Sequence, residues 1–148
     1  MEAIIFCGIQ GSGKSTYFRE CFFQTHVRIS LDVLRTRSRE KKFLAVCLES
    51  KQRFVVDNTN PTQADRAVYI QAAKERKFTV TCYSFSSRIE DAIARNALRS
   101  GKARVPDVAI RNTLDKLEHP SLSEGFDALY HVAIVDGEFI VSEWNAHV

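Results

Sequence analysis

Residues Gly8-Ile9-Gln10-Gly11-Ser12-Gly13-Lys14-Ser15 form the stretch that decides how this chain folds. They match the pattern G-x-x-x-x-G-K-S/T at all four fixed positions, which a chain of average composition would match by accident about once in a few hundred sequences. The apolar run Ala3-Ile4-Ile5-Phe6-Cys7 comes directly before them. Because this pattern binds phosphate where a buried strand enters a glycine-rich turn and then a helix, we expect a phosphate-binding loop here.

The residue types of this loop suit a polyphosphate. Backbone N–H groups at a helix start carry partial positive charge, and glycines permit close approach and left-handed dihedrals. The ammonium of Lys14 can reach the β- and γ-phosphates, and the hydroxyl of Ser15, with Thr16 beside it, can hold Mg²⁺. The nucleotide-binding residues that we expect are Gly8, Gln10, Gly11, Ser12, Gly13, Lys14, Ser15 and Thr16.

Length and composition indicate one globular unit. The chain has 148 residues, 45% of them hydrophobic, and a net charge of +3. This size allows a core but leaves little room for a second catalytic module, so we expect a single domain over residues 1–148. The four cysteines form no C-x-x-C pair and indicate reduced thiols. We find no signal-peptide pattern and no bilayer-spanning run, and expect a cytoplasmic protein without a membrane partner.

Strand patterns alternate with helix patterns along the chain. Short apolar runs predict strands, and segments with a period of 3.6 residues predict the helices between them. The expected strands cover residues 3–7, 27–30, 54–56, 78–85, 130–135 and 138–141, and the expected helices cover 14–24, 31 to about 51, 64–76, 88–100 and 107–119. The alternation predicts an α/β fold, a three-layer sandwich with a mainly parallel sheet. The turn Asp136-Gly137 predicts an antiparallel hairpin at its edge.

Polar side chains follow the second and third expected strands, at the end where a doubly wound sheet binds ligands. Asp32 could face the γ-phosphate and accept the proton of an attacking hydroxyl. An aspartate that only interacts with the dipole of its helix is the alternative. Asp57-Asn58-Thr59-Asn60-Pro61 closes the third strand. Asp57 could hold a Mg²⁺-bound water, or it could cap this turn.

A basic helix and loop form a further cluster. Arg88, Arg95 and Arg99 are spaced as one stripe of a helix, and the basic loop 101–106 follows them. Such a segment can act as a lid that closes over phosphates and brings arginines to developing charge. A solvated arginine face is the alternative, which we prefer for Arg88. Seven basic residues between 35 and 53 could likewise form a rim for a single-stranded nucleic acid or a solvated helix surface.

These motifs resemble the polynucleotide 5′-kinase family, which are P-loop kinases, over nearly the whole chain from residue 3 to about 128. The segment 57–61 resembles the D-N-T-N-P of the animal enzyme, and Pro120-Ser121-Leu122-Ser123-Glu124-Gly125-Phe126 resembles its P-T-L-x-E-G-F. Asp32-Val33-Leu34-Arg35 resembles the phage D-D-Y-R. Arg95-Asn96-Ala97-Leu98-Arg99 and the later Val105-Pro106 resemble the phage R-N-x-x-R and V-P.

The resemblance implies an ATP- and Mg²⁺-dependent kinase that acts on the 5′-hydroxyl of a DNA or RNA end. It implies Asp32 as the general base, Arg99 as the lid catalyst beside Lys14, and Arg35 as the contact to the acceptor phosphate. The remaining implied residues are Arg95 for the nucleotide, Asn58, Thr59 and Asn60 for the acceptor, and Ser15 and Asp57 for the metal.

Other functions remain open at this point. The family's N-R-D is Ser30-Leu31-Asp32 here, and the pattern S-x-D-x-x-R also occurs in P-loop kinases that act on small molecules. A kinase for a nucleoside, sugar or antibiotic is therefore the second interpretation. A nucleotide-gated module that hydrolyses ATP slowly is the third, because phosphate-binding loops also serve switches.

Overall fold

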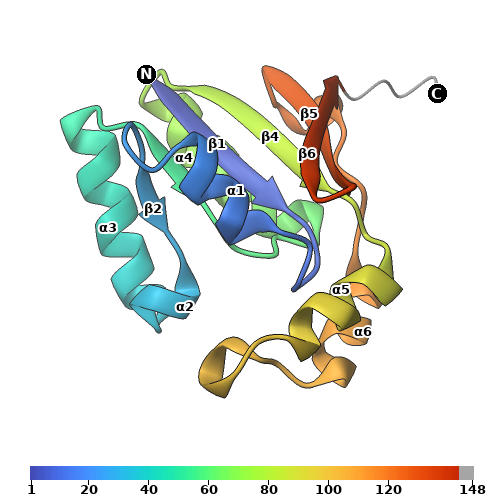
Figure 1. The fold of residues 1–148 in the computed structure, drawn as a ribbon. Helices are drawn as coiled ribbons and strands as arrows, with labels where there is room; N and C mark the ends of the chain where they lie inside the picture. The colour runs from blue at the N-terminus through green and yellow to red at the C-terminus, as the bar shows by residue number, and fades with distance from the viewer. Residues whose placement is uncertain (144–148) are drawn as a thin grey trace.

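The computed structural model describes residues 1–143 and shows an α/β fold built on one six-stranded sheet (Figure 1). The strands run in the order β2-β3-β1-β4-β5-β6. Their bounds are β1 Glu2–Cys7, β2 Val27–Ile29, β3 Phe54–Val56, β4 Thr79–Phe85, β5 Ala128–Val135 and β6 Glu138–Glu143. All neighbours pair in parallel except β5 and β6, which pair antiparallel. The predicted parallel sheet with a hairpin edge is confirmed; the last five residues of the predicted domain, 144–148, lie outside the described part.

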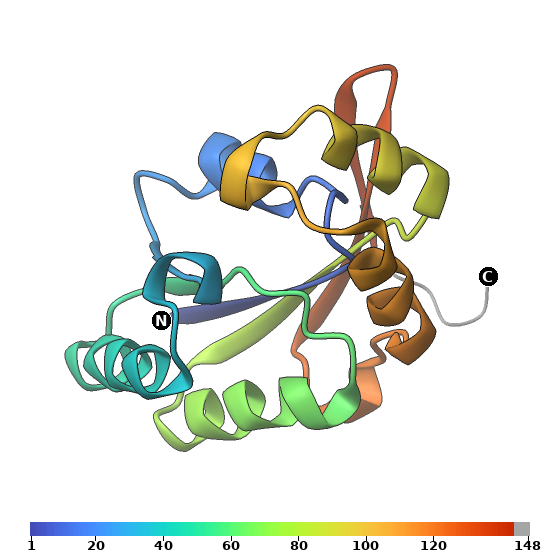
Figure 2. The same ribbon diagram turned by 90° about the horizontal axis from the view of Figure 1, so that it is seen from below.

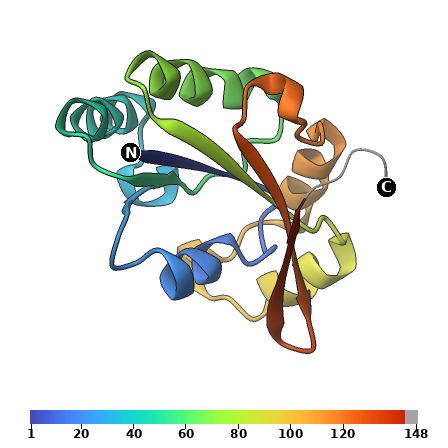
Figure 3. The same cartoon turned by 90° about the horizontal axis from the view of Figure 1, so that it is seen from above.

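Helices cover both faces of the sheet. They are α1 Lys14–Cys21, α2 Leu31–Leu34, α3 Arg37–Ser50, α4 Gln63–Glu75, α5 Ile89–Ala97 and α6 Asp107–Lys116, with short 3-10 turns at Gly101–Ala103 and Leu122–Glu124. Helix α1 lies on one face and α4 on the opposite face, as the view from above shows (Figure 3). This arrangement is the three-layer sandwich that the alternation of strands and helices predicts.

The central strand β1 explains why its sequence is apolar at every position. Ile4 lies opposite Val55 of β3 and Thr81 of β4, so the strand is paired on both edges. Ile5 and its alternate neighbours pack against α3 and α4, whereas Phe6 packs against α1 and against Phe85 with ring centroids 5.0 Å apart. A strand buried on both faces needs apolar side chains on both, since successive side chains point to opposite sides.

One expected helix is divided in the structure. The pattern predicts a single helix from residue 31 to about 51, but the chain breaks after α2 and restarts as α3. Arg35 has a positive φ of 73°, and Thr36 is extended and caps α3 by accepting a hydrogen bond from the backbone of Arg39 at 3.1 Å. No glycine marks this break, which is why the periodicity does not reveal it. The helices predicted over 14–24 and 88–100 also end about three residues early, at Cys21 and Ala97.

Helices α5 and α6, joined by the turn at residues 101–103, form a segment that we call the lid (residues 89–116) below the carboxyl ends of the parallel strands (Figure 1). Figure 2 looks from that side and shows the lid across the strand ends, with α1 and α4 on opposite sides of the sheet. The lid has a small core of Ile9, Ala92 and Ile110. A Cβ on Gly11 would lie 2.5 Å from the carbonyl oxygen of Ala92, so only glycine lets α5 pack this closely on the loop.

No helix of residues 1–143 has the length and apolar character needed to cross a bilayer.

Candidate active site

The loop 8–15 connects β1 to α1, as its pattern predicts. Gly11 and Gly13 have positive φ angles of 78° and 96°, and Gly13 is the N-cap residue directly before α1. The hydroxyl of Ser12 and the side-chain oxygen of Gln10 are buried and accept no hydrogen bond from the described part of the chain. Left-handed glycines of this kind allow a loop to turn backbone amides toward an anion.

Lys14 folds back over this loop. Its Nζ donates hydrogen bonds to the carbonyl oxygens of Gly8 at 3.0 Å and of Ile9 at 2.9 Å. Burial lowers the pKa of Lys14 from 10.5 to about 8, while the carboxylates of Asp57 and Asp32 act in the opposite direction. Neutral carbonyl oxygens therefore hold the ammonium at the site, and a bound anion would supply the negative counter-charge that the carbonyls do not provide.

A cavity of about 810 Å³ opens in front of the loop, between α2, the end of β3 and the lid. Its wall carries seven basic side chains and three acidic ones. Of the predicted site residues, the wall includes Gln10, Gly11, Lys14, Ser15, Thr16, Asp32, Arg35, Asp57, Asn58, Thr59, Asn60 and Arg99, whereas Gly8, Ser12, Gly13 and Arg95 lie outside it. The surplus of positive charge in one concave space favours a polyanionic ligand.

Ser15 and Asp57, the predicted metal ligands, lie side by side. The Ser15 hydroxyl donates a hydrogen bond to Oδ2 of Asp57 at 3.0 Å, and the Asp57 side chain is only 1% exposed. A hydroxyl and a carboxylate oxygen form a donor set that suits Mg²⁺, which prefers oxygen ligands. These residues fit the ion that the resemblance implies.

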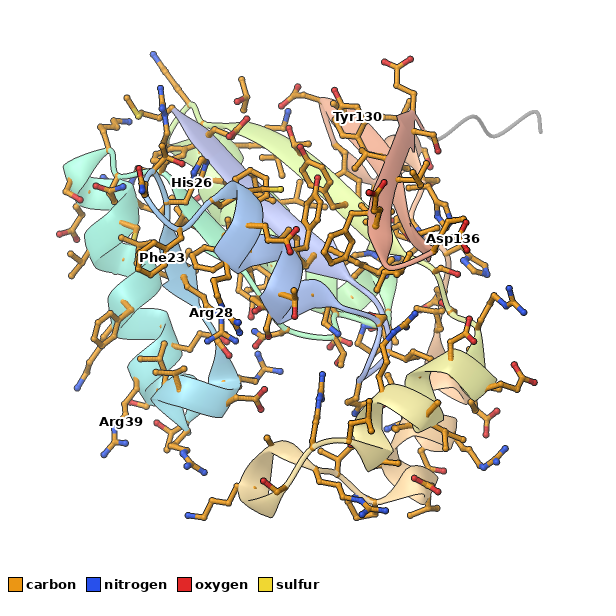
Figure 4. All side chains as sticks on the ribbon, in the orientation of Figure 1. Phe23, His26, Arg28, Arg39, Tyr130 and Asp136 are labelled. Atoms are coloured by element: carbon orange, nitrogen blue, oxygen red, sulfur yellow. The ribbon has the colours of Figure 1, made fainter. Side chains whose placement is uncertain are left out.

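Arg28 joins this pair, and the sequence reasoning missed it. Its Nε donates to Oδ2 of Asp57 at 2.8 Å, and its Nη2 donates to the hydroxyl of Ser15 at 3.0 Å. Figure 4 shows Arg28 extending from β2 into the space beside α1. A basic residue inside a short strand next to the loop was the available signal, but its partner lies 29 residues further along the chain.

Asp32 stands at the start of α2 and is exposed on the cavity wall. The hydroxyl of Ser30 accepts a hydrogen bond from the backbone N–H of Asp32 at 3.2 Å, as an N-cap does. The side-chain oxygen of Asn58 accepts from the backbone N–H of Leu31 at 2.9 Å. Two backbone donors of this short helix are thus satisfied, and the helix end that carries Asp32 is fixed to the end of β3.

A buried carboxylate supports this arrangement from behind. Glu40 of α3 is 5% exposed and accepts hydrogen bonds from Asn58 at 2.8 Å, from Arg37 at 3.1 Å and from the Tyr69 hydroxyl. Burial and the neighbouring Glu40 carboxylate raise the pKa of Tyr69, so its hydroxyl stays a donor. Sequence reasoning did not find Glu40, because two of its three partners, Asn58 and Tyr69, come from distant parts of the chain.

Hydrogen bonds to β1 and to the phosphate-binding loop hold the loop that follows β3. The backbone oxygen of Thr59 accepts from the Gly8 N–H at 3.0 Å, and the amide of Asn60 donates to the Phe6 carbonyl at 2.8 Å. Both hydrogen-bonding atoms of the Asn58 side chain also have partners inside the protein. The structure thus gives Asn58 and Asn60 a role in holding the site, and their contact with an acceptor stays a prediction.

A fully buried arginine ties this loop to the Pro120–Phe126 motif. Nε and Nη2 of Arg66 donate to the two carboxylate oxygens of Glu124 at 2.9 and 3.1 Å. Its Nη1 donates to the carbonyl of Asn60 at 2.9 Å. Such a two-pronged pair is strong and directional, so it fixes the loop that carries Asp57 to α4 and to the 3-10 turn Leu122–Glu124.

The arginines of the lid point to different partners. Nη1 of Arg95 donates to the Gly11 carbonyl at 3.1 Å. Arg99 lines the cavity. Burial is the main cause that lowers the pKa of Lys14, and the positive charge of Arg99 lowers it further. The buried Asn96 between them forms two hydrogen bonds with the backbone of Val105, at 2.6 and 3.0 Å. Arg88 is exposed, as expected. The R-N-x-x-R pattern therefore joins α5 to the loop, to the cavity and to the rest of the lid.

Known proteins resemble this chain in sequence or in fold. Residues 4–120 match the family described as AAA domain. A curated relative, the bifunctional polynucleotide phosphatase/kinase of Schizosaccharomyces pombe, is 28% identical over 148 residues, and the match covers 97% of this chain and 36% of the relative. The chain thus spans about a third of that relative's length. The match agrees with the resemblance seen in the motifs.

Two solved structures share the fold. A gluconokinase from Sinorhizobium meliloti 1021 is 18% identical with a TM-score of 0.63, over 91% of this chain and 83% of its own. Chaetomium thermophilum Kti12 in complex with ADP-AlF3 is 19% identical with a TM-score of 0.63, over 88% of each chain. At this identity the similarity concerns the fold.

Proposed function

The chain belongs to the AAA domain family, and from this premise we propose that it is a P-loop kinase that transfers the γ-phosphoryl group of ATP to the 5′-hydroxyl of a DNA or RNA end. One observation carries the proposal: the carboxylate of Asp32 shares a single basic cavity with Lys14 and Arg99. Phosphoryl transfer requires a base for the acceptor and cations for the donor within one concave space. The likeness to a polynucleotide phosphatase/kinase supports the choice of acceptor.

The donor side consists of the loop and the lid. Backbone amides of the loop and the ammonium of Lys14 bind the β- and γ-phosphates. Arg99 reaches the negative charge that develops on the transferred group, and Arg95 holds α5 against the loop through Gly11. Mg²⁺, when bound by Ser15 and Asp57, neutralises charge on the phosphates.

The acceptor side consists of α2 and its supports. Asp32 accepts the hydrogen bond of the attacking hydroxyl and later its proton. The transition state of phosphoryl transfer is loose, so orientation of the hydroxyl contributes more than the strength of the base. Ser30 and Asn58 supply that orientation because they fix the start of α2. Arg35, at the end of α2, binds a phosphate of the acceptor strand.

A kinase for a small hydroxylated molecule is the second candidate. Ser30, Asp32 and Arg35 follow the S-x-D-x-x-R pattern found in metabolite kinases. The likeness to a polynucleotide phosphatase/kinase favours a polymer, and Arg19, Arg35 and Lys102 on the cavity wall suit an additional phosphodiester backbone.

The test uses ATP labelled on its γ-phosphate, with Mg²⁺, a 5′-hydroxyl DNA or RNA oligonucleotide, and in parallel nucleosides and simple sugars. The proposal expects label on the oligonucleotide, loss of labelling in Asp32→Asn, and normal labelling in Asp136→Asn. Asp136 is a matched control because it lies in the hairpin turn outside the cavity wall, with a φ of 50° that asparagine also adopts.

Each remaining outcome has one meaning. Label that appears only on small molecules would replace the first candidate with the second. ATP hydrolysis without any labelled acceptor, unchanged in Asp32→Asn, would instead indicate a nucleotide-gated switch.

A further inference from the structure

Three polar groups close a ring at the predicted metal site. Nε of Arg28 and the hydroxyl of Ser15 both donate to the same oxygen of Asp57, at 2.8 and 3.0 Å. Nη2 of Arg28 completes the ring with its hydrogen bond to the Ser15 hydroxyl at 3.0 Å. The guanidinium therefore hydrogen-bonds the Ser15 hydroxyl and one of the two carboxylate oxygens of Asp57.

Burial makes this contact necessary in the absence of a ligand. The Asp57 side chain is 1% exposed and the Arg28 side chain 27%. A buried carboxylate without a counter-charge is strongly unfavourable, so a cation must accompany Asp57 in every state of the protein. In the structure Arg28 is in direct contact with Asp57, and the ammonium of Lys14 also interacts with this carboxylate.

A divalent ion cannot share these atoms with Arg28. Mg²⁺ binds its oxygen ligands at about 2.1 Å and holds them in an octahedral arrangement. Oδ2 of Asp57 and the hydroxyl of Ser15 are already hydrogen-bonded to Arg28, and an ion on either carboxylate oxygen would lie next to the guanidinium, a charge of the same sign. Binding of the metal therefore requires that Arg28 leaves.

A second hollow provides space for the Arg28 side chain away from Asp57. A hollow of about 230 Å³ lies beside the main cavity, lined by Arg28, Arg19, Phe23 and the hydroxyl-bearing Ser15. Figure 4 shows Phe23 and Arg28 on the same side of α1. The face of an aromatic ring is a favourable site for a guanidinium.

We propose that Arg28 keeps free Mg²⁺ out of the Ser15 and Asp57 pair, and that the metal enters only together with the nucleotide. The triphosphate brings the negative charge that offsets the repulsion and that draws the guanidinium away from Asp57. Arg28 is thus the residue that sets the order of binding. The inference rests on the assignment of Ser15 and Asp57 as metal ligands in the proposed function.

Mn²⁺ binding to the intact, nucleotide-free protein tests this inference without an activity assay, by electron paramagnetic resonance of the free ion. Arg28→Gln removes a charged hydrogen bond, so it should bind Mn²⁺ at least about tenfold more tightly than the wild type. Arg19→Gln is the matched control: it removes one positive charge from the same two cavity walls but no hydrogen bond to Asp57. Its affinity for Mn²⁺ should stay within about twofold of the wild type, because an exposed charge interacts weakly.

ATP provides the second comparison. In its presence Arg28 is already displaced, so the advantage of Arg28→Gln over the wild type should fall to about threefold or less. Equal Mn²⁺ affinities of the nucleotide-free wild type and Arg28→Gln, or weaker binding by the variant, would overturn the inference. If Arg28→Gln does not fold by circular dichroism, Arg28→Met keeps the aliphatic stem and gives the same readout.

The variant Asp57→Asn tests the assignment of the metal ligands independently of the role of Arg28. In the wild-type background it should weaken Mn²⁺ binding only when ATP is present, because Arg28 already excludes the free ion. No effect with ATP would remove Asp57 from the metal site. Clearly weaker Mn²⁺ binding by Asp57→Asn without ATP would mean that the free ion reaches Asp57 although Arg28 is present, and it would contradict the inference.

Discussion

Lys14 makes the stability of the nucleotide-free protein rise with pH. Its ammonium is buried against two carbonyl oxygens, at 3.0 Å from Gly8 and 2.9 Å from Ile9. Burial lowers its pKa from 10.5 to about 8. Between these two values the unfolded chain still binds a proton that the folded protein has released, so the free energy of unfolding increases with pH in this window.

The size of the effect follows from the two pKa values. Below pH 8 both states carry the charge, and folding includes the full cost of burying it. As pH rises through 8 the folded lysine becomes neutral, and the gain in stability is about 1 kcal/mol by pH 9 and about 2 to 3 kcal/mol by pH 10. Above pH 10.5 both states are neutral and the gain stops.

The assay compares the wild type with Lys14→Met in urea unfolding followed by circular dichroism, at pH 7, 8, 9 and 10. Other groups titrate in the same window; burial raises the pKa of Cys7 to about 11, which lowers stability as pH rises. Such groups are present in both proteins and cancel in the difference, apart from the small part of the Cys7 shift that the charge of Lys14 itself causes. That difference should move in favour of the wild type by about 1 kcal/mol between pH 7 and 9.

Parallel curves for the two proteins over this range would refute the reasoning. They would mean that Lys14 keeps its ordinary pKa in the folded protein, so that the loop solvates its ammonium as well as water does.

Three substitutions test the lid, the acceptor contact and the loop anchor. Arg99→Ala should lower kcat about 10³-fold with little change in ATP affinity, because its charge acts on the transition state, whereas the exposed Arg88→Ala should change neither. Arg35→Ala should raise the acceptor KM at low salt, and the deficit should shrink as salt rises, since the contact is with a phosphate. Glu124→Gln should lower the free energy of unfolding in urea by about 3 kcal/mol, because it leaves the fully buried Arg66 without a counter-charge.

Each of these expectations has a contrary result. A loss in Arg99→Ala that is confined to the KM for ATP would place that arginine in ground-state binding. An unchanged acceptor KM at low salt would remove Arg35 from the acceptor site. A stability of Glu124→Gln within about 1 kcal/mol of the wild type would show that the buried guanidinium is satisfied by its other partners.

The layered sheet was predictable because its signals are local. The run Ala3-Ile4-Ile5-Phe6-Cys7 is apolar at every position and became the central strand, paired on both edges. The fixed residues of the loop need particular backbone dihedrals within a few positions of one another, and Gly11 and Gly13 adopt them. The turn at Asp136-Gly137 joins two adjacent strands, so it also depends on neighbours in the sequence alone.

The division between α2 and α3 was not predictable in this way. Arg35 carries a positive φ of 73°, a conformation that costs energy for a residue with a side chain. Helical periodicity runs through the break without a glycine to mark it. The interruption is stabilised locally by the cap that Thr36 provides for α3, and from a distant part of the chain by the hydrogen bond of Asn58 to the start of α2.

The sequence by itself determined the phosphate-binding loop, the order of strands and helices along the chain, and the set of candidate side chains at the strand ends. The tertiary structure alone decided which of these side chains meet: Arg28 with Asp57, Glu40 with Asn58, and Arg66 with Glu124, over 29, 18 and 58 positions. The physical reason is the separation along the chain over which each kind of interaction acts. Periodicity and turn chemistry act between residues a few positions apart, whereas the partner of a buried charge depends on which strands become neighbours when the whole sheet forms.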